Sequence, residues 1–255
     1  ADAYNGLSDV MLVYMRQQRC YDNPYTGEIC HADDGYIVNH PTRNGEKIDA
    51  RGGWHDATDY LQYQTTSGTA LYHMMFAWQQ QKDKSVFKDM YDARGGKGSN
   101  GIPDILDEIK WGMEWMVRMN PEDKVMFNQI ADDRDHAGFR LPQNDKVDYG
   151  WGPGKGRPVY FVTGEPTGLG KWINRSTGVS SVAGKFASCF ALGSEIFKDS
   201  DPKYSEKLME KAKQAYAFAE EKPGNTQTAC VVSPYFYEED TYVDDIELAA
   251  ATFYN

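Results

Sequence analysis

The sequence predicts an all-α protein built from pairs of packed helices. Apolar residues recur with helical periodicity in separate segments, long polar loops join these segments, and no confident long strand interrupts them. The chain has 255 residues, of which 40% are hydrophobic, so it is long enough to bury a sizeable core. The predicted helices cover residues 3–18, 59–81, about 103–119, about 180–198, 202–221 and about 242–255.

Each of the first three predicted helices carries an apolar face. The faces consist of Leu7, Val10, Met11 and Tyr14 in the first, Leu71, Met74, Met75 and Trp78 in the second, and Ile105, Ile109, Met113 and Met116 in the third. Pro103 suits the first turn of the third helix, because the N–H that proline lacks is not needed there.

The later helices have clear start signals and are preceded by long loops. Asp201 and Pro202 provide an N-cap and a first-turn proline for the helix at 202–221. Residues 20–55 are predicted to be a loop, and residues 120–178 form the longest irregular stretch. A loop of that length inside a compact domain is usually functional, so we expect residues 120–178 to shape a binding cleft.

The charge of the chain limits its partners. With 27 basic and 38 acidic residues, the net charge is −11, which argues against a nucleic acid or an anionic membrane as partner. No apolar run approaches the ~18–20 residues of a membrane span. Aromatic residues make up 13% of the chain, which fits ordinary packing and also a groove that stacks on sugar rings. The acidic, tyrosine-rich composition suggests a secreted, cell-surface or periplasmic protein.

The first candidate site is the segment G-G-W-H-D-A-T-D-Y at residues 52–60. Asp56 and Asp59 are three residues apart, so they lie on one face of a forming turn. Aspartates near a helix start are also typical of capping, and that role alone explains an isolated pair. The chemical interpretation is that the two carboxylates hold one water molecule, one of them accepting its proton.

This segment resembles the G-G-[YW]-[YH]-D-A-G-D-[YH] motif of glycoside hydrolase family nine, the inverting cellulases. Further segments are similar to motifs of that family in the same order: N-G-I-P-D-I-L-D-E at 100–108, N-R-S-T-G-V at 174–179, A-G-K at 183–185 and D-D-I-E-L-A-A-A at 244–251.

The resemblance implies an (α/α)6 barrel that hydrolyses β-1,4-glucan by an inverting mechanism, with Asp59 as general base and Asp56 orienting the water. Thr58 stands where the family usually has glycine. Because a β-branched residue does not readily adopt a positive φ, we expect ordinary dihedral angles at this position.

The family's general acid, a glutamate near the end of its catalytic module, has no counterpart in residues 1–255. The expectation is therefore that the chain is part of one catalytic domain, about the first half of the barrel, and that the acid lies on a missing segment or a second chain. Such a half-barrel would leave apolar helix faces uncovered and would not fold stably alone. The alternatives are a non-catalytic glycan-binding half-barrel and an enzyme for another β-glycan, such as xyloglucan or a glucosamine polymer.

The second candidate site begins at the acidic run 132–135. Such a run is often only a solvated charged face. The family has a D-H…W-G-P stretch lining its cleft, so the resemblance maps His136 and Trp151 to substrate contacts. Arg140 is a further candidate for substrate binding, and Trp54 is expected beside the two aspartates.

Two structural metal sites are also candidates, and no organic cofactor is expected. Cys20 and Cys30 either form a disulfide, remain free thiols, or bind zinc together with His31, as in some members of the family. The family's fourth zinc ligand would fall at Gln62, which is a poor ligand, and His55 could replace it only if the loop geometry allows.

The second metal candidate lies before the last predicted helix. The family often binds calcium here, which implies ligands from Asp240, Asp244 and Asp245 and from the carbonyl of Thr241. Clustered carboxylates before a helix also simply satisfy its N-terminus.

Overall fold

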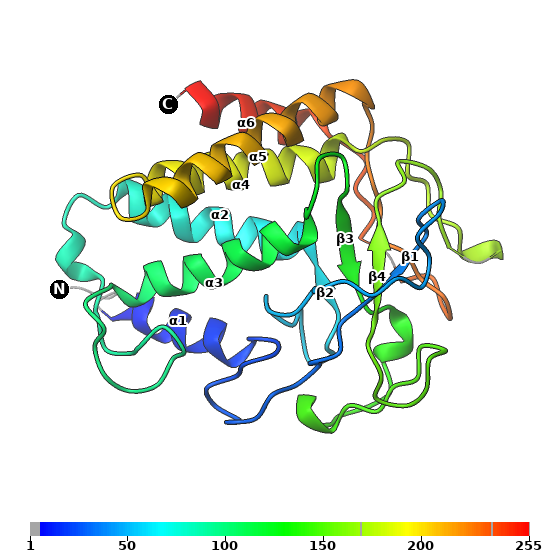
Figure 1. Cartoon of the computed structure of the whole chain (residues 1–255), viewed down its shortest axis with the longest axis horizontal. Coiled ribbons are helices and arrows are strands. Elements are labelled where there is room, and N and C mark those ends of the chain that lie inside the picture. The colour runs from blue at the N-terminus through cyan, green and yellow to red at the C-terminus, as the bar shows by residue number, and fades with distance from the viewer. Residues whose placement is uncertain (1–5, 169, 236, 255) are drawn as a thin grey trace.

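The computed structural model describes residues 6–168, 170–235 and 237–254 and shows a helix-rich protein (Figure 1). Its α-helices are α1 (Leu7–Gln17), α2 (Gln64–Gln80), α3 (Asp104–Met119), α4 (Ser180–Phe197), α5 (Pro202–Glu221) and α6 (Val243–Tyr254). Short 3₁₀ turns lie at Lys84–Val86, Asp133–Asp135, Pro142–Asn144 and Gly170–Trp172. The six predicted helices are confirmed, except that residues 3–5 and 255 of those predictions lie outside the described residues.

A small sheet corrects the all-α prediction. Its strands are β1 (Tyr36–Val38), β2 (Gln62–Tyr63), β3 (Phe127–Ile130) and β4 (Pro158–Phe161), in the order β1-β4-β3-β2. β1 runs parallel to β4, and the other two pairs are antiparallel. The sheet lies beside the ends of α2 and α3 (Figure 1). It therefore orders part of the stretch predicted to be irregular. Strand β2 follows directly after Asp56 and Asp59, so the sheet also fixes the chain next to them.

The second helix begins later than predicted. Gln62 and Tyr63 pair with β3, with Gln62 opposite Ile130, so α2 starts only at Gln64. The two candidate aspartates are therefore held in a turn before a strand, not in the first turn of the helix.

Helix α4 is the centre of the core and packs against α2, α5 and α6. It is buried along nearly its whole length, and its small residues allow the neighbours to approach closely. A Cβ atom at Gly184 would lie 2.9 Å from the backbone of Asp245 in α6. The predicted capping of α5 is confirmed, because the Asp201 side chain accepts from the Tyr204 N–H at 3.2 Å.

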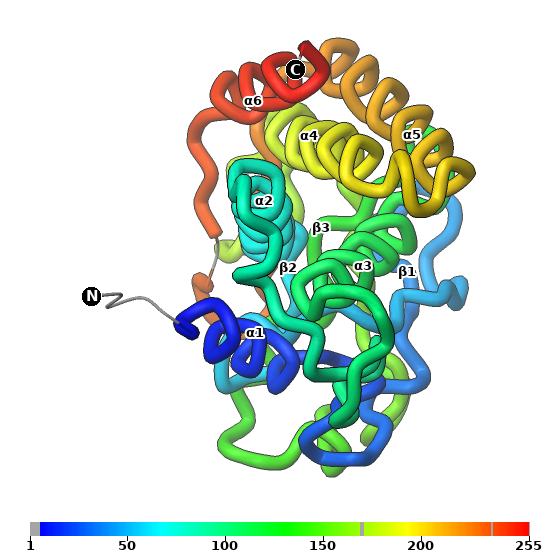
Figure 2. The backbone as a smooth tube through the Cα atoms, turned by 90° about the vertical axis from the view of Figure 1, so that its left-hand side faces the viewer, coloured from blue at the N-terminus to red at the C-terminus, as the bar shows by residue number. Residues whose placement is uncertain are grey.

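The apolar face of α1 is the exception to this packing. Its apolar residues are exposed by 45–66%, although their spacing is that of a buried helix face: Leu7, Val10, Met11 and Tyr14. Helices α6, α2 and α1 follow one another along the left-hand side of Figure 2. Within the described residues, no helix has both the length and the apolar character needed to cross a membrane.

Candidate functional site

Asp56 and Asp59 lie in a turn that begins at two glycines and ends at β2. Gly53 has a φ of 70°, and a Cβ atom there would come within 2.6 Å of the Trp115 ring, so only glycine fits. Thr58 is absent from the residues with positive φ, which confirms the expectation of ordinary dihedral angles at this position.

Asp56 is fixed by two hydroxyl donors. The Thr66 hydroxyl donates to its Oδ1 at 2.5 Å, and the Tyr237 phenol donates to its Oδ2 at 2.6 Å. Asp56 lines a surface hollow of about 150 Å³, and its partners Thr66 and Tyr237 line another of about 520 Å³. Asp56 is therefore a positioned carboxylate next to open space.

Asp59 keeps one carboxylate oxygen free. Its Oδ2 lies 3.2 Å from Nε2 of His136, whereas its Oδ1 is buried without a hydrogen-bond partner among the described residues. Burial, together with the nearby carboxylates of Asp135 and Asp56, raises the pKa of Asp59. A half-buried carboxylate with a raised pKa and a free oxygen is suited to accept a proton from water.

Residues 231–235 and 237 lie next to His136 and Asp56, a placement that no sequence motif predicted. The Asp133 carboxylate accepts the backbone N–H groups of Val231, Val232 and Ser233 at 2.5–2.8 Å. The same segment brings the Tyr235 ring to 4.8 Å from the His136 ring and the Tyr237 phenol to Asp56. Only the tertiary contact with Asp133, about 100 residues earlier, reveals this role.

The other predicted substrate contacts occupy different environments. His136 reaches Asp59 and its side chain is 35% exposed. Trp151 stacks on Tyr36 with ring centroids 4.7 Å apart. Arg140 forms ion pairs with Asp135 and Asp145, each at 2.7 Å, and its role in substrate binding stays a prediction.

Trp54 lies beside the aspartate turn, where it lines the same hollow as Asp56. It is only 4% exposed, its indole N–H donates to Glu108 Oε1 at 2.7 Å, and its ring packs so tightly on α3 that a Cβ atom at Gly112 would lie 2.1 Å from it. Its ring is thus largely covered by protein at the base of the turn, and a role of Trp54 in substrate binding stays a prediction.

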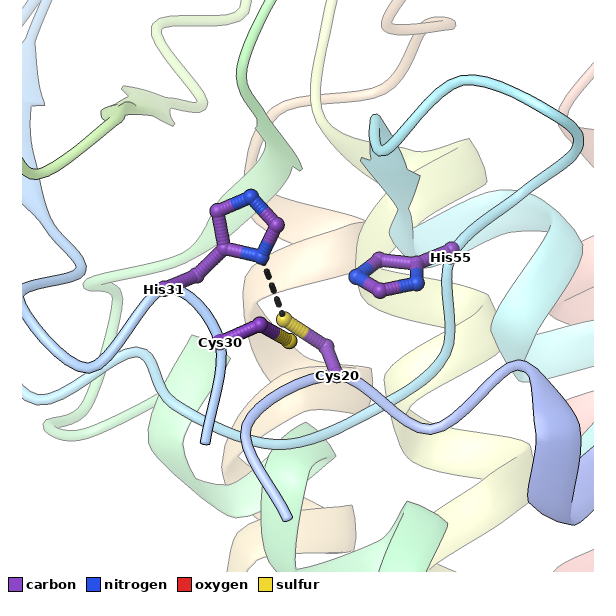
Figure 3. Close-up of side chains that lie close together, drawn as sticks. All are labelled: Cys20, Cys30, His31 and His55. Atoms are coloured by element: carbon purple, nitrogen blue, oxygen red, sulfur yellow. Dashed lines mark hydrogen bonds between the residues drawn. The ribbon is translucent and has the colours of Figure 1, made fainter. Parts of the chain in front are cut away.

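Four potential metal ligands gather behind the aspartate turn. The side chains of Cys20, Cys30, His31 and His55 place one ligand atom each within 4.8 Å of one another (Figure 3). The segments 18–20 and 53–55 meet through backbone bonds, with the His55 N–H donating to Gln18 O at 2.8 Å. This contact brings in His55 as the fourth member. The disulfide alternative is not realised, because all four cysteines of the chain are free.

The chemistry of the cluster fits a metal ion. Burial lowers the pKa of His55 to about 4, so its imidazole is neutral, and its Nε2 is buried without a partner. Hydrogen bonding with Cys20 lowers the pKa of Cys30, so the pair favours a thiolate. Nδ1 of His31 faces Cys20 at 3.5 Å, while Nε2 lies 3.1 Å from Asp145 Oδ2. A carboxylate behind a ligating histidine is typical of metal sites.

Gln62 lies next to this cluster but outside it. Its Nε2 donates to Gly52 O at 2.7 Å, and its Oε1 accepts from Arg157 at the same distance. Arg157 in turn donates to Cys20 Sγ at 3.3 Å and pairs with Asp34 at 2.7 Å. Gln62 therefore supports the surroundings of the cluster through Arg157.

Two of the predicted calcium ligands have cationic partners within the protein. Asp245 pairs with Lys185 at 2.7 Å, and the same ammonium group pairs with Glu239 at 2.7 Å. Asp240 lies 3.6 Å from Arg175 on the surface. Among the described residues, the acidic side chains of 239–245 form no group of metal-ligand geometry. Lys185 and Arg175 thus neutralise part of the segment in the absence of a metal ion, and calcium binding by Asp240, Thr241, Asp244 and Asp245 stays a prediction.

Paired carboxylates that lie in a turn next to the Tyr235 and Tyr237 rings suit the acid–base chemistry of a glycoside hydrolase. The family model described as "Glycosyl hydrolase family 9" matches residues 4–255, so this chain belongs to that family.

Among curated proteins, the chain is 28% identical over 202 residues to endoglucanase D of Acetivibrio thermocellus, covering 79% of this chain and 28% of the relative. It is 27% identical over 231 residues to a cellodextrinase of Butyrivibrio fibrisolvens, covering 87% of this chain and 37% of the relative. The chain thus spans only about a third of the length of these relatives.

Among solved structures, a metagenome-derived glycoside hydrolase family 9 endoglucanase matches with a TM-score of 0.74 and 28% identity. The match covers 98% of this chain and 42% of that one. The arrangement of helices and loops described above is therefore that of one part of such an enzyme.

Proposed function

We propose that this chain supplies the general-base side of an active site that hydrolyses β-1,4-glucosidic bonds in cellulose or a related β-glucan by an inverting mechanism. The observation that carries the proposal is Asp59 Oδ1, which is buried, has no partner among the described residues and belongs to a carboxyl group whose pKa is raised. Family membership supports the substrate class.

The two aspartates divide the work in this proposal. Asp59 accepts the proton of the attacking water through its free oxygen. Asp56 orients that water, because its hydrogen bonds to Thr66 and Tyr237 hold the carboxylate in one position. His136 contacts Asp59 and binds a sugar hydroxyl, and the Trp151 ring, backed by Tyr36, provides a stacking surface.

The general acid belongs to a part of the enzyme outside residues 1–255. Inverting hydrolysis needs a second carboxyl group ~6.5–9.5 Å from the base across the scissile bond. We propose that residues 1–255 form part of one (α/α)6 catalytic domain, and that a further segment or a second chain completes the barrel and carries the acid glutamate. The exposed apolar face of α1 supports this arrangement. A polymeric glucan substrate lies outside the cytoplasm, so we place the enzyme at the cell exterior or in the periplasm.

The Cys/His cluster is proposed to bind zinc through Cys20, Cys30, His31 and His55. Two sulfur and two nitrogen ligands suit tetrahedral zinc. When bound, the ion would supply no reaction chemistry but would cross-link the segments 20–31 and 53–55, the second of which leads directly into the aspartate turn.

The decisive test is Asp59→Asn in the intact enzyme, assayed on soluble β-glucan. Loss of the base should lower kcat by ~10²–10⁴-fold while glucan binding changes little. Asp199→Asn, an exposed aspartate after α4, is the matched control and should retain full activity. Unchanged turnover in Asp59→Asn would overturn the proposal, and glucan binding without any turnover in the wild type would favour the glycan-binding alternative.

A further inference from the structure

A continuous line of buried charged groups connects the Cys/His cluster with the backbone of the aspartate turn. Its three members are Asp135, Arg140 and Asp145, all from the loop that follows β3. The side chains of Asp135, Asp145 and Arg140 are 0%, 5% and 15% exposed. Three charges are rarely buried together unless each has a partner. The outer partners of these groups therefore show which parts of the protein the line connects.

At one end, Asp135 forms a hydrogen bond with the turn that contains Asp59. Its Oδ2 accepts the backbone N–H of Tyr60 at 2.5 Å, which fixes the peptide unit directly after Asp59. The next residue in the chain, His136, contacts the Asp59 carboxylate at 3.2 Å. Residues 135 and 136 therefore fix Asp59 in two ways. Asp135 binds the main chain directly after Asp59, and His136 contacts the Asp59 side chain.

At the other end, Asp145 reaches the Cys/His cluster. Its Oδ2 lies 3.1 Å from Nε2 of His31, and its Oδ1 accepts from Nε of Arg140 at 2.7 Å. Nη2 of Arg140 then donates to Asp135 Oδ1 at 2.7 Å. Each carboxylate uses one oxygen for the arginine and the other for the outer partner, so all the contacts coexist.

The Tyr60 ring closes the arrangement from the side. The Arg140 guanidinium lies 4.8 Å from its centroid, and the rings of His31 and His55 lie 5.6 Å and 4.8 Å away. The Tyr60 hydroxyl donates to the Arg140 carbonyl. The Tyr60 ring is thus packed between the cluster and Arg140. The backbone N–H of the same residue donates to Asp135.

We infer that Asp135 is a positioning residue for Asp59, and that Arg140 and Asp145 form a strut that transmits the order of the Cys/His cluster to the aspartate turn. This inference rests on the proposed function for the role of Asp59, but the coupling between Asp135 and Asp59 exists whether or not glucan is the substrate. The Asp135 charge is also one of the causes that raise the pKa of Asp59.

The first test is Asp135→Asn in the intact enzyme, with the ionisation of Asp59 followed by carboxyl ¹³C NMR and by the pH profile of kcat. Removing the like charge should lower the pKa of Asp59 and shift the acidic limb of the profile to lower pH. Asp199→Asn is the control, because this exposed aspartate after α4 removes the same charge far from the turn in sequence. An Asp59 pKa that is equal in the wild type and in Asp135→Asn would overturn the inference.

The NMR arm needs no turnover, so it separates this inference from the proposed function. If Asp59→Asn keeps full activity while Asp135→Asn still shifts the titration of Asp59, the general-base role fails and the coupling stands.

The strut is tested by Arg140→Lys, which also serves if Asp135→Asn does not fold. Lysine keeps the charge but cannot bridge both carboxylates with a planar fork. We expect kcat to fall by up to ~100-fold with KM unchanged, because a small displacement of a catalytic group is costly. Metal content should be retained, since Arg140 is not a ligand.

Arg134→Lys is the control for the strut, because Arg134 pairs with Asp132 in the same loop at 2.7 Å. Equal kcat values for Arg140→Lys and Arg134→Lys would overturn the role of the strut.

Discussion

The two segments predicted to bind metals behave in opposite ways. In the Cys/His cluster, four ligand atoms converge, and Nε2 of His55 is buried without a partner in the described part of the chain. In the acidic segment 239–245, the carboxylates turn toward cations of the protein, with Lys185 between Glu239 and Asp245. Each segment has one buried ligand atom without a hydrogen-bond partner among the described residues, Nε2 of His55 and Oε2 of Glu239, but only the first brings four ligand atoms together.

The difference shows that a ligand set is defined as much by its surroundings as by its residues. A lysine ammonium at 2.7 Å neutralises a carboxylate without the dehydration of a metal ion. The cluster has no such internal cation on its histidines, and the one buried arginine that reaches it, Arg157, donates to Cys20 and also pairs with Asp34. Such a donor supports a thiolate ligand without replacing the metal.

The largest expected effect is the loss of zinc from His55→Ala. Removing one of four ligands should abolish tight binding, and the wild type should lose about 4 kcal/mol of stability on chelation if free zinc had exceeded its Kd ~1000-fold. Zinc per chain by atomic spectroscopy and Tm with and without a chelator measure both effects. Asp244→Asn, from the acidic segment, is the control and should change neither value.

A chain that holds no zinc, or whose Tm is the same with and without the chelator, would show that the cluster is a hydrogen-bonded thiol site. The contrast between the two segments would then disappear.

The helices were predictable because their signals are local. Pro103 and the Asp201–Pro202 pair mark helix starts, and the apolar spacing marks the buried faces. The strands were not, because β3 and β4 are four residues long and almost wholly buried, which removes the alternation that identifies a half-buried strand.

The site was predictable only where a motif is contiguous. Asp56, Asp59 and His136 lie in short motifs, and the structure brings them together around one turn. His55 as fourth member of the cluster, Tyr237 on Asp56 and Asp133 under 231–233 depend on contacts between distant segments. Residue spacing contains no information about such contacts, and the ion pair with Lys185 was hidden for the same reason.

A second, intermediate effect is the pH dependence caused by Asp245. Burial raises the pKa of Asp245 to about 6, whereas the unfolded chain releases this proton near pH 4. The folded state therefore holds the proton longer, and the stability falls as pH rises from about 4 to about 6, by up to about 3 kcal/mol.

Asp245→Asn removes this titration, so urea unfolding should show a smaller decline in unfolding free energy over the same pH window. Asp244→Asn, the exposed neighbour, should keep the wild-type slope. Equal slopes for Asp245→Asn and the wild type would mean that Lys185 already neutralises Asp245 fully in the folded state.

The smallest expected effect is that of Arg175→Gln. Arg175 lies 3.2 Å from Glu238 and 3.6 Å from Asp240, but the three side chains are 65%, 51% and 76% exposed. Exposed pairs of this kind contribute ~0–1 kcal/mol and are screened by salt, so the unfolding free energy measured in urea at 0.15 M salt should change by less than about 0.5 kcal/mol.

The response of the Arg175→Gln variant to calcium is the sharper observation. With Arg175 gone, the carboxylates of Glu238 and Asp240 lose a cationic partner, but among the described residues they belong to no converging group of metal ligands, so added Ca²⁺ should leave the Tm of Arg175→Gln unchanged. A calcium-dependent rise in that Tm would mean that the arginine alone had kept the ion out, and that the two segments differ in one counter-ion and not in the arrangement of their ligands.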